Sequence, residues 1–129
     1  MAYEALHSGP YSFKATAAYT TEQHHLMVCG ADGYASLAGA GGVCIGVLQN
    51  KPSAAGQAAE IAVYGITKVV SDGSGVNIVV GDKLKADASG HAVKAATDAD
   101  MVAGIALNAS TAAGTIISMI LTIGAQRAS

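Results

Sequence analysis

The chain has 129 residues, 51% of them hydrophobic and only 12% charged, with 16 glycines, no tryptophan and a net charge of −2. This length fits one domain, and its core of Ala, Val, Ile and Leu with few rings is shallow, so packing against copies or a larger partner would stabilise it. The scattered Lys and Arg residues form no basic patch, which excludes nucleic acid as a partner.

The N-terminal stretch, MAYEALHSGPYSF, is rich in aromatic residues and lacks the basic and apolar regions of a secretory signal. Three of the six aromatic residues of the chain lie here, namely Tyr3, Tyr11 and Phe13, together with Leu6. We predict an extended arm over residues 1–12, whose apolar side chains, with Phe13, fill pockets on a neighbour. A disordered terminus is the alternative.

The remaining residues, 13–129, are predicted to form a single all-β domain. A strand over Phe13–Tyr19 comes first. Two tandem β-units follow over about residues 22–70 and 80–124, with a Gly/Ser-rich joint at 71–75 between them. Units of this size are too small to bury a face alone, so we expect two half-barrels that share one core in a small β-barrel or sandwich.

The two units contain nearly the same phrase, once with charges and once almost purely apolar. The first copy, GVLQNKPSAAGQAAEIAV, begins at Gly46, and the second copy, GIALNASTAAGTIISMIL, begins at Gly104. At this offset of 58 residues, Asn50 also matches Asn108. Each copy predicts a strand, an Ala-Ala-Gly corner and a second strand, in the ranges Val43–Leu48 and Ala58–Val63, then Met101–Leu107 and Thr115–Thr122.

The repeat bears on a candidate membrane segment. Residues 101–123 carry no charge over a length that could span a bilayer as a helix. The equivalent stretch of the first copy contains Lys51, Pro52 and Glu60, which a spanning helix would not choose. Because both copies are expected to fold alike, we predict strands here and no membrane partner.

Each unit also predicts a hairpin before the repeated phrase. Residues 26–38, LMVCGADGYASLA, match residues 84–95, LKADASGHAVKA, with one residue of slippage. The predicted turns are Asp32-Gly33 and Ser89-Gly90, where Asp or Ser bonds locally and Gly accepts a positive φ.

No group of residues predicts catalysis, a cofactor or a metal ion. His24 and His25 are adjacent on a predicted strand, so they point to opposite faces and are not expected to share a metal with Cys29. The other histidines are isolated in sequence, and surface or turn positions are expected for all of them. Cys29 and Cys44 are expected to be reduced, buried thiols rather than a disulfide. The glycines at 39–42 lack the lysine of a phosphate loop.

The repeated phrases resemble the capsid decoration, or head cement, proteins of tailed bacteriophages. The likeness covers roughly residues 11–123, and it lies in the stretches at 42–70, 80–95 and 101–121, above all in GVLQNKPSAAG followed by GITKV. The stretch TTEQHHLMVCGADG, at 20–33, departs from the more regular pattern of the family. No role is therefore carried over to its histidines and cysteine.

The resemblance implies a non-catalytic structural virion protein without cofactors. Such a protein would bind the major capsid protein on the outer surface of the icosahedral head and stabilise the head, as a homotrimer or other homo-oligomer. It would be made in the bacterial host cytoplasm. Tyr3, Leu6, Tyr11 and Phe13 are then the expected residues of the capsid or oligomer interface.

Two other functions stay open. A carrier or ligand-binding β-barrel of the lipoyl or biotinyl type shares the twofold repeat, but such domains present a lysine at a hairpin tip. Neither Gly33 nor Gly90 has a lysine beside it, and Lys68 lies in a predicted strand. The other alternative is a structural module of a different shell or surface layer.

Overall fold

The computed structural model describes residues 10–96 and 100–123, which form β-strands and no helix. The predicted all-β class is confirmed. The strands are β1 (Tyr11–Lys14), β2 (Leu26–Cys29), β3 (Ala35–Leu37), β4 (Cys44–Leu48), β5 (Ala58–Ala62), β6 (Ile66–Asp72), β7 (Lys83–Ala86), β8 (Ala92–Lys94), β9 (Gly104–Ala106) and β10 (Ala113–Leu121).

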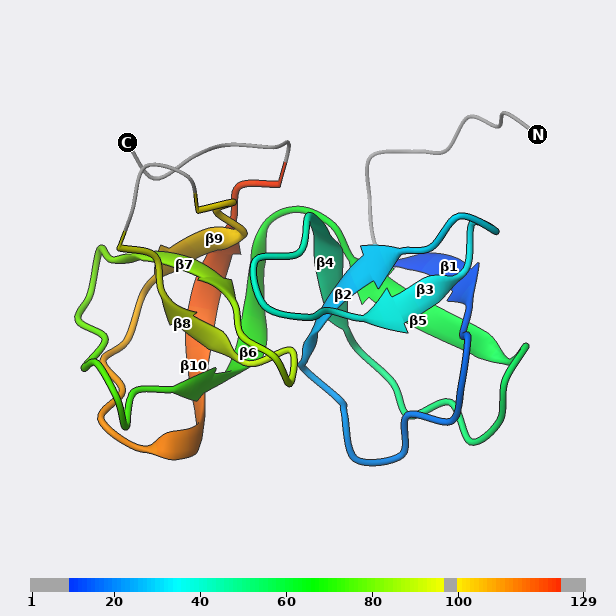
Figure 1. The fold of residues 1–129 in the computed structure, drawn as a ribbon, viewed down its shortest axis with the longest axis horizontal. Helices are drawn as coiled ribbons and strands as arrows, with labels where there is room; N and C mark the ends of the chain where they lie inside the picture. The colour runs from blue at the N-terminus through cyan, green and yellow to red at the C-terminus, as the bar shows by residue number, and fades with distance from the viewer. Residues whose placement is uncertain (1–9, 97–99, 124–129) are drawn as a thin grey trace.

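The strands form two five-stranded units that lie side by side (Figure 1). The first unit has the strand order β1-β5-β4-β2-β3, and the second has the equivalent order β6-β10-β9-β7-β8. A parallel contact between Ser71 of β6 and Ala92 of β8 closes the second unit into a barrel. At the same place in the first unit, an isolated parallel bridge joins Ala15, just after β1, to Ala35 of β3.

The sequence repeat appears in matching hydrogen bonds, which confirms two tandem β-repeats. The side-chain oxygen of Asn50 accepts a hydrogen bond from the backbone N–H of Glu60 at 3.0 Å. The side-chain oxygen of Asn108 accepts one from the N–H of Ser118 at 2.8 Å. In each copy the asparagine therefore ties the turn to the strand that follows it.

Close approach of two backbones explains the glycine that begins each copy. A Cβ atom on Gly46 would collide with the carbonyl oxygen of Ala62 in β5, and one on Gly104 would collide with the carbonyl oxygen of Ile120 in β10. Only a residue without a side chain fits at these positions.

Buried hydrophobic residues form two clusters. One lies within the first unit and consists of Ala15, Tyr19, Met27, Ala35, Leu48, Ala59 and Ile61. The other fills the second unit and extends into the first, where Leu26 and Val47 belong to it. The expectation of two half-barrels around one core is therefore wrong in part. Five strands enclose a narrow interior that small side chains can fill, so each unit has its own sheet and its own buried centre.

Strand pairing moves two of the predicted boundaries. β6 pairs with β10, so residues 66–70 belong with the second unit rather than at the end of the first. The strand predicted over 13–19 is wrong at both ends, because β1 covers Tyr11–Lys14 and pairs with β5 there. Its pairing partner lies far along the sequence, so local pattern alone does not define its ends.

Backbone hydrogen bonds connect the two units directly. The N–H of Leu26 donates to the carbonyl of Gly90 at 2.8 Å, and the N–H of Val70 donates to the carbonyl of His24 at 2.9 Å. Gly90 adopts a positive φ of 76° in the β7–β8 turn, as predicted, and Gly33 has a φ of 82° in the β2–β3 turn. The second hairpin turn thus lies against the first unit.

Both cysteines are free thiols, but only one of them is buried. Cys44 lies in the core, where burial raises the pKa of its thiol to about 11. Cys29 is exposed at the end of β2, which corrects the expectation that both are buried. Among the described residues, no helix has the length and hydropathy needed to cross a membrane.

Alanine at Gly46 or Gly104 should destabilise the protein by about 1–3 kcal/mol, because the new methyl group forces facing strands apart. Denaturant unfolding of each variant measures this loss. Gly39→Ala and Gly75→Ala are matched controls, since a Cβ there meets no atom within 4 Å. Equal stability of all four variants would contradict the close approach.

The two thiols should differ in reactivity toward a thiol reagent at pH 8. Cys29 is accessible, whereas Cys44 is buried and its raised pKa leaves little thiolate at this pH. We expect rapid modification of Cys29 alone in the native protein and of both thiols in denaturant. Rapid native modification in a Cys29→Ser variant would show that Cys44 is not buried.

Candidate functional site

The outward face of β6 and β10 carries exposed apolar side chains on either side of a central polar pair, Lys68 and Ser118. Outward and buried residues alternate along both strands, and Ile66 is 66% exposed while Ile116 is 55% exposed. Ile66 lies opposite Ile120 in the ladder, and Lys68 lies opposite Ser118 beside them. We call the outward residues of these two strands the apolar stripe: Ile66, Lys68, Val70, Ile116, Ser118 and Ile120. Neighbouring exposed apolar side chains of this kind mark an interaction surface.

A surface groove adjoins one end of the apolar stripe. It is lined by Pro10, Gln49, Ala62, Tyr64, Gly65 and Ile66. Tyr64 is 51% exposed and adds a ring to this end of the surface. Pro10, the first described residue, lines the groove, and Ile66 belongs to both the groove and the apolar stripe. The groove and the stripe therefore form one continuous candidate contact surface.

Of the four residues predicted for an interface, the structure describes two, Tyr11 and Phe13. Tyr11 and Phe13 lie in β1, opposite Ile61 and Ala59 of β5. Phe13 is partly buried against the core of the first unit, which gives it a packing role in the fold. Tyr3 and Leu6 lie outside the described residues, and an interface role for any of these four residues stays a prediction.

Sequence reasoning missed the apolar stripe. Ile66, Ile116 and Ile120 lie in strands as hydrophobic as the buried ones, and nothing local shows which side faces outward. The signal that could have identified them is the alternation of Lys68 and Ser118 with the buried positions. That signal becomes readable only when β6 and β10 are known to pair with each other.

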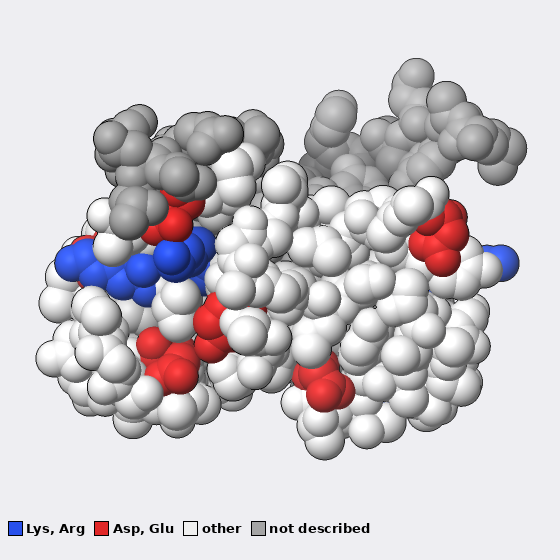
Figure 2. All heavy atoms as spheres, viewed as in Figure 1, with Lys and Arg blue, Asp and Glu red and all other residues white. Residues whose placement is uncertain are grey.

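Charged side chains are concentrated elsewhere on the second unit. Figure 2 shows lysine side chains gathered over the region of β7 and β8, with carboxylates around them, while most of this face is uncharged. Lys85 pairs with Asp100 at 3.0 Å, and Lys94 lies 3.7 Å from Asp82. In each pair the aspartate offsets the charge of the lysine, so this region does not form a positively charged surface for an anionic partner.

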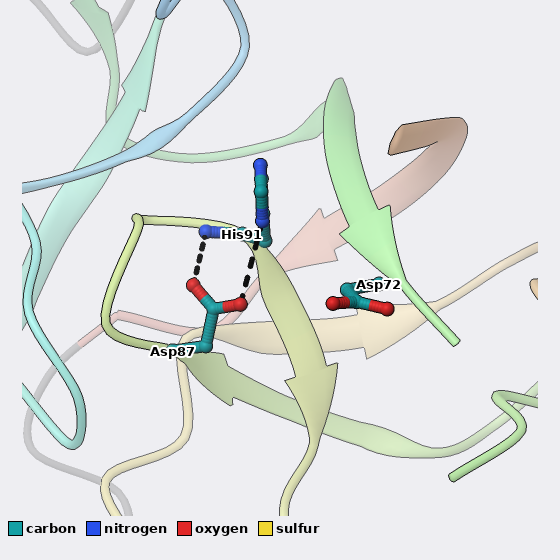
Figure 3. A group of neighbouring side chains, drawn as sticks. All are labelled: Asp72, Asp87 and His91. Atoms are coloured by element: carbon teal, nitrogen blue, oxygen red, sulfur yellow. Dashed lines mark hydrogen bonds and ion pairs between the residues drawn. The ribbon is translucent and has the colours of Figure 1, made fainter. Parts of the chain in front are cut away.

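The structure brings one histidine beside two carboxylates. His91, which the sequence presents as isolated, lies just before β8, and its Nδ1 is 3.4 Å from Oδ2 of Asp87. Asp72, at the end of β6, completes a group whose ligand atoms lie within 4.8 Å of one another. Figure 3 shows one oxygen of Asp72 pointing toward this pair.

The sequence predicts that the adjacent histidines lie on a strand. They lie instead at a turn just before β2. His24 has a positive φ of 68°, and its buried Nδ1 has no hydrogen-bond partner among the described residues. Burial, followed by Lys68 and other nearby positive groups, lowers the pKa of His24. His25 is 9% exposed rather than at the surface, and its ring lies 4.8 Å from that of His91 at the contact between the units.

Comparison with solved structures shows a related fold. The chain is similar to the protein described as the head fiber gp8.5 N base in bacteriophage phi29, with a TM-score of 0.63 and 16% sequence identity. The alignment covers 91% of this chain and 96% of that one. The similarity spans both units, so the two-unit architecture occurs in a known phage protein.

Comparison at the level of sequence identifies the family. No curated protein matches the chain. A family model described as phage cement protein matches residues 7–121, which include every strand of both units. This chain therefore belongs to the phage cement protein family.

Proposed function

We propose that this protein binds the outer surface of the icosahedral phage head and stabilises the assembled shell. Membership of the phage cement family supports this role most strongly. The role is structural, and it needs a rigid body with an adhesive surface rather than a reaction centre. A barrel with an exposed apolar stripe has that design.

The contact surface that we propose consists of the N-terminal segment, the groove beside Pro10 and the apolar stripe. Exposed isoleucine and tyrosine side chains supply apolar area that is removed from water when a partner covers it. The partner we propose is the major capsid protein. Tyr3 and Leu6 lie outside the described residues, and we propose that they add contacts to a neighbouring sheet edge or pocket.

Repetition makes moderate contacts sufficient for stable attachment. A head presents many identical sites, and a homotrimer or other homo-oligomer would engage several of them at once. Each further contact is then made at high effective concentration. We infer that copies assembled around a symmetry axis connect neighbouring capsid subunits, and this connection resists the outward pressure of packaged DNA.

Deletion of residues 2–9 tests the N-terminal segment and leaves β1 intact, since β1 begins at Tyr11. We expect an unchanged thermal unfolding temperature and at least a tenfold loss of affinity for expanded heads, measured by co-sedimentation. A full-length Tyr3→Ala, Leu6→Ala variant separates loss of side chains from loss of length. Binding of the deletion variant at the original affinity would remove this segment from the proposed contact surface.

An aspartate at Ile66 or Ile116 tests the apolar stripe. These exposed positions should tolerate the change with a stability difference of about 0.5 kcal/mol or less. Head binding should fall by tenfold or more, because a charge must then be buried against the shell. Val43→Asp is the matched control, since Val43 is also exposed, at 56%, but lies in the first unit before β4.

Analytical ultracentrifugation of the same variants separates two uses of the apolar stripe. A capsid-facing stripe predicts an unchanged oligomeric state in solution together with weaker head binding. Dissociation into monomers would instead show that the stripe joins copies of this chain, and it would contradict the proposed capsid contact.

A further inference from the structure

We propose that Asp72, Asp87 and His91 bind a divalent transition-metal ion of the Zn²⁺ and Mn²⁺ class, which fastens β6 to β8 where the second unit closes. This inference does not depend on the proposed function. It stands on the geometry of three side chains from two parts of one unit, the end of β6 and the β7–β8 turn, which meet beside the closing contact of the barrel.

The ligand atoms have spacings that suit a metal ion. His91 Nδ1 and Asp87 Oδ2 are 3.4 Å apart. This distance is longer than an ordinary N–H···O hydrogen bond, but it equals the separation of about 3.4 Å between two ligands at 2.0–2.2 Å from a tetrahedral ion. An atom of Asp72 lies within 4.8 Å of both, and a small change of its side-chain torsion brings it into the same sphere.

Each carboxylate is held by one oxygen and leaves the other one available. Oδ1 of Asp87 accepts hydrogen bonds from the backbone N–H groups of Ser89 and His91, at 2.8 Å and 2.9 Å. Oδ1 of Asp72 accepts hydrogen bonds from the backbone and the hydroxyl of Ser74. The other oxygen of Asp87 lies 3.4 Å from Nδ1 of His91, and Figure 3 shows one oxygen of Asp72 pointing toward this pair.

The charges around the site favour a cation. The two carboxylates lie within 4.8 Å of each other, and Lys85 and Lys94 in β7 and β8 pair with Asp100 and Asp82 instead. A bound divalent ion would offset both negative charges.

The histidine is oriented by the first unit. The ring of His91 packs at 4.8 Å against the ring of His25, and Nδ1 of His25 lies 2.9 Å from the carbonyl oxygen of Ser89 in the β7–β8 turn. A metal ion on His91 would therefore also stiffen the contact between the two units.

The position of the site gives the ion a structural task. Ser71 and Ala92 are the residue pair that joins β6 to β8. Asp72 directly follows Ser71, and His91 directly precedes Ala92. The ion would hold both sides of this one-pair closure. The ligand set of two carboxylates and one imidazole suits Zn²⁺ or Mn²⁺, whereas Mg²⁺ and Ca²⁺ prefer oxygen ligands throughout.

The first experiment measures thermal unfolding of untagged, metal-free protein at pH 7.5 with added Mn²⁺, Zn²⁺, Mg²⁺ or Ca²⁺. A Cys29→Ser background removes the exposed thiol as a competing zinc ligand. We expect Tm to rise with Mn²⁺ or Zn²⁺ by about 10 °C at a hundredfold excess over Kd, and to return to its starting value with EDTA. Mg²⁺ and Ca²⁺ should give little change.

Variants assign the effect to the proposed ligands. Asp72→Asn and His91→Gln should each weaken Mn²⁺ binding by tenfold or more, measured by isothermal titration calorimetry. Asp32→Asn is the matched control, because Asp32 also accepts a turn N–H, from Tyr34 at 2.9 Å, but lies in the first unit. Wild-type affinity in either ligand variant would overturn the site.

A spectroscopic measurement on the unaltered protein locates the ion even if a ligand variant fails to fold. Substoichiometric Mn²⁺ should broaden the amide NMR signals of residues 71–75 and 87–92 and leave the equivalent hairpin turn at 30–36 sharp. Broadening confined to other residues, or none at millimolar Mn²⁺, would overturn the proposal.

Discussion

The structure depends on a constraint of space: five strands form each unit around a narrow interior, where alanines pack beside a few larger side chains such as Leu84 and Met119. Gly46 and Gly104 meet this constraint where facing strands approach too closely for any Cβ atom. Alanines such as Ala59, Ala92 and Ala106, all fully buried, meet it inside the units. The alanine- and glycine-rich composition therefore suits this architecture.

The same constraint explains how far the sequence predicts the fold. The sequence correctly indicates two strand-rich copies. The evidence is the offset of 58 residues, the paired asparagines and the glycine turns, and these features act locally through turns and backbone contacts. The assignment of β6 to the second unit depends on pairing with β10, more than forty positions away, which a local pattern does not contain. The sequence does not predict the division of the core into two clusters either, because this division also depends on which distant strands pair.

Surface features were predicted less completely than the fold. The N-terminal aromatic residues attract attention in the sequence, yet Phe13 serves packing within the first unit. The apolar stripe is hidden in strands whose outward side is defined only by register. Likewise, Asp72 and His91 are nineteen positions apart and come together through one parallel residue pair, between Ser71 and Ala92. Residues that gain a role through strand pairing are those that sequence reasoning misses.

A density map of phage heads that carry this protein tests the central claim most directly. The account predicts two-lobed density at regularly repeated sites on the outside of the head, with β6 and β10 of each copy turned toward the shell. Heads whose outer surface carries no such density, or copies whose apolar stripe faces solvent with the opposite side against the shell, would contradict it.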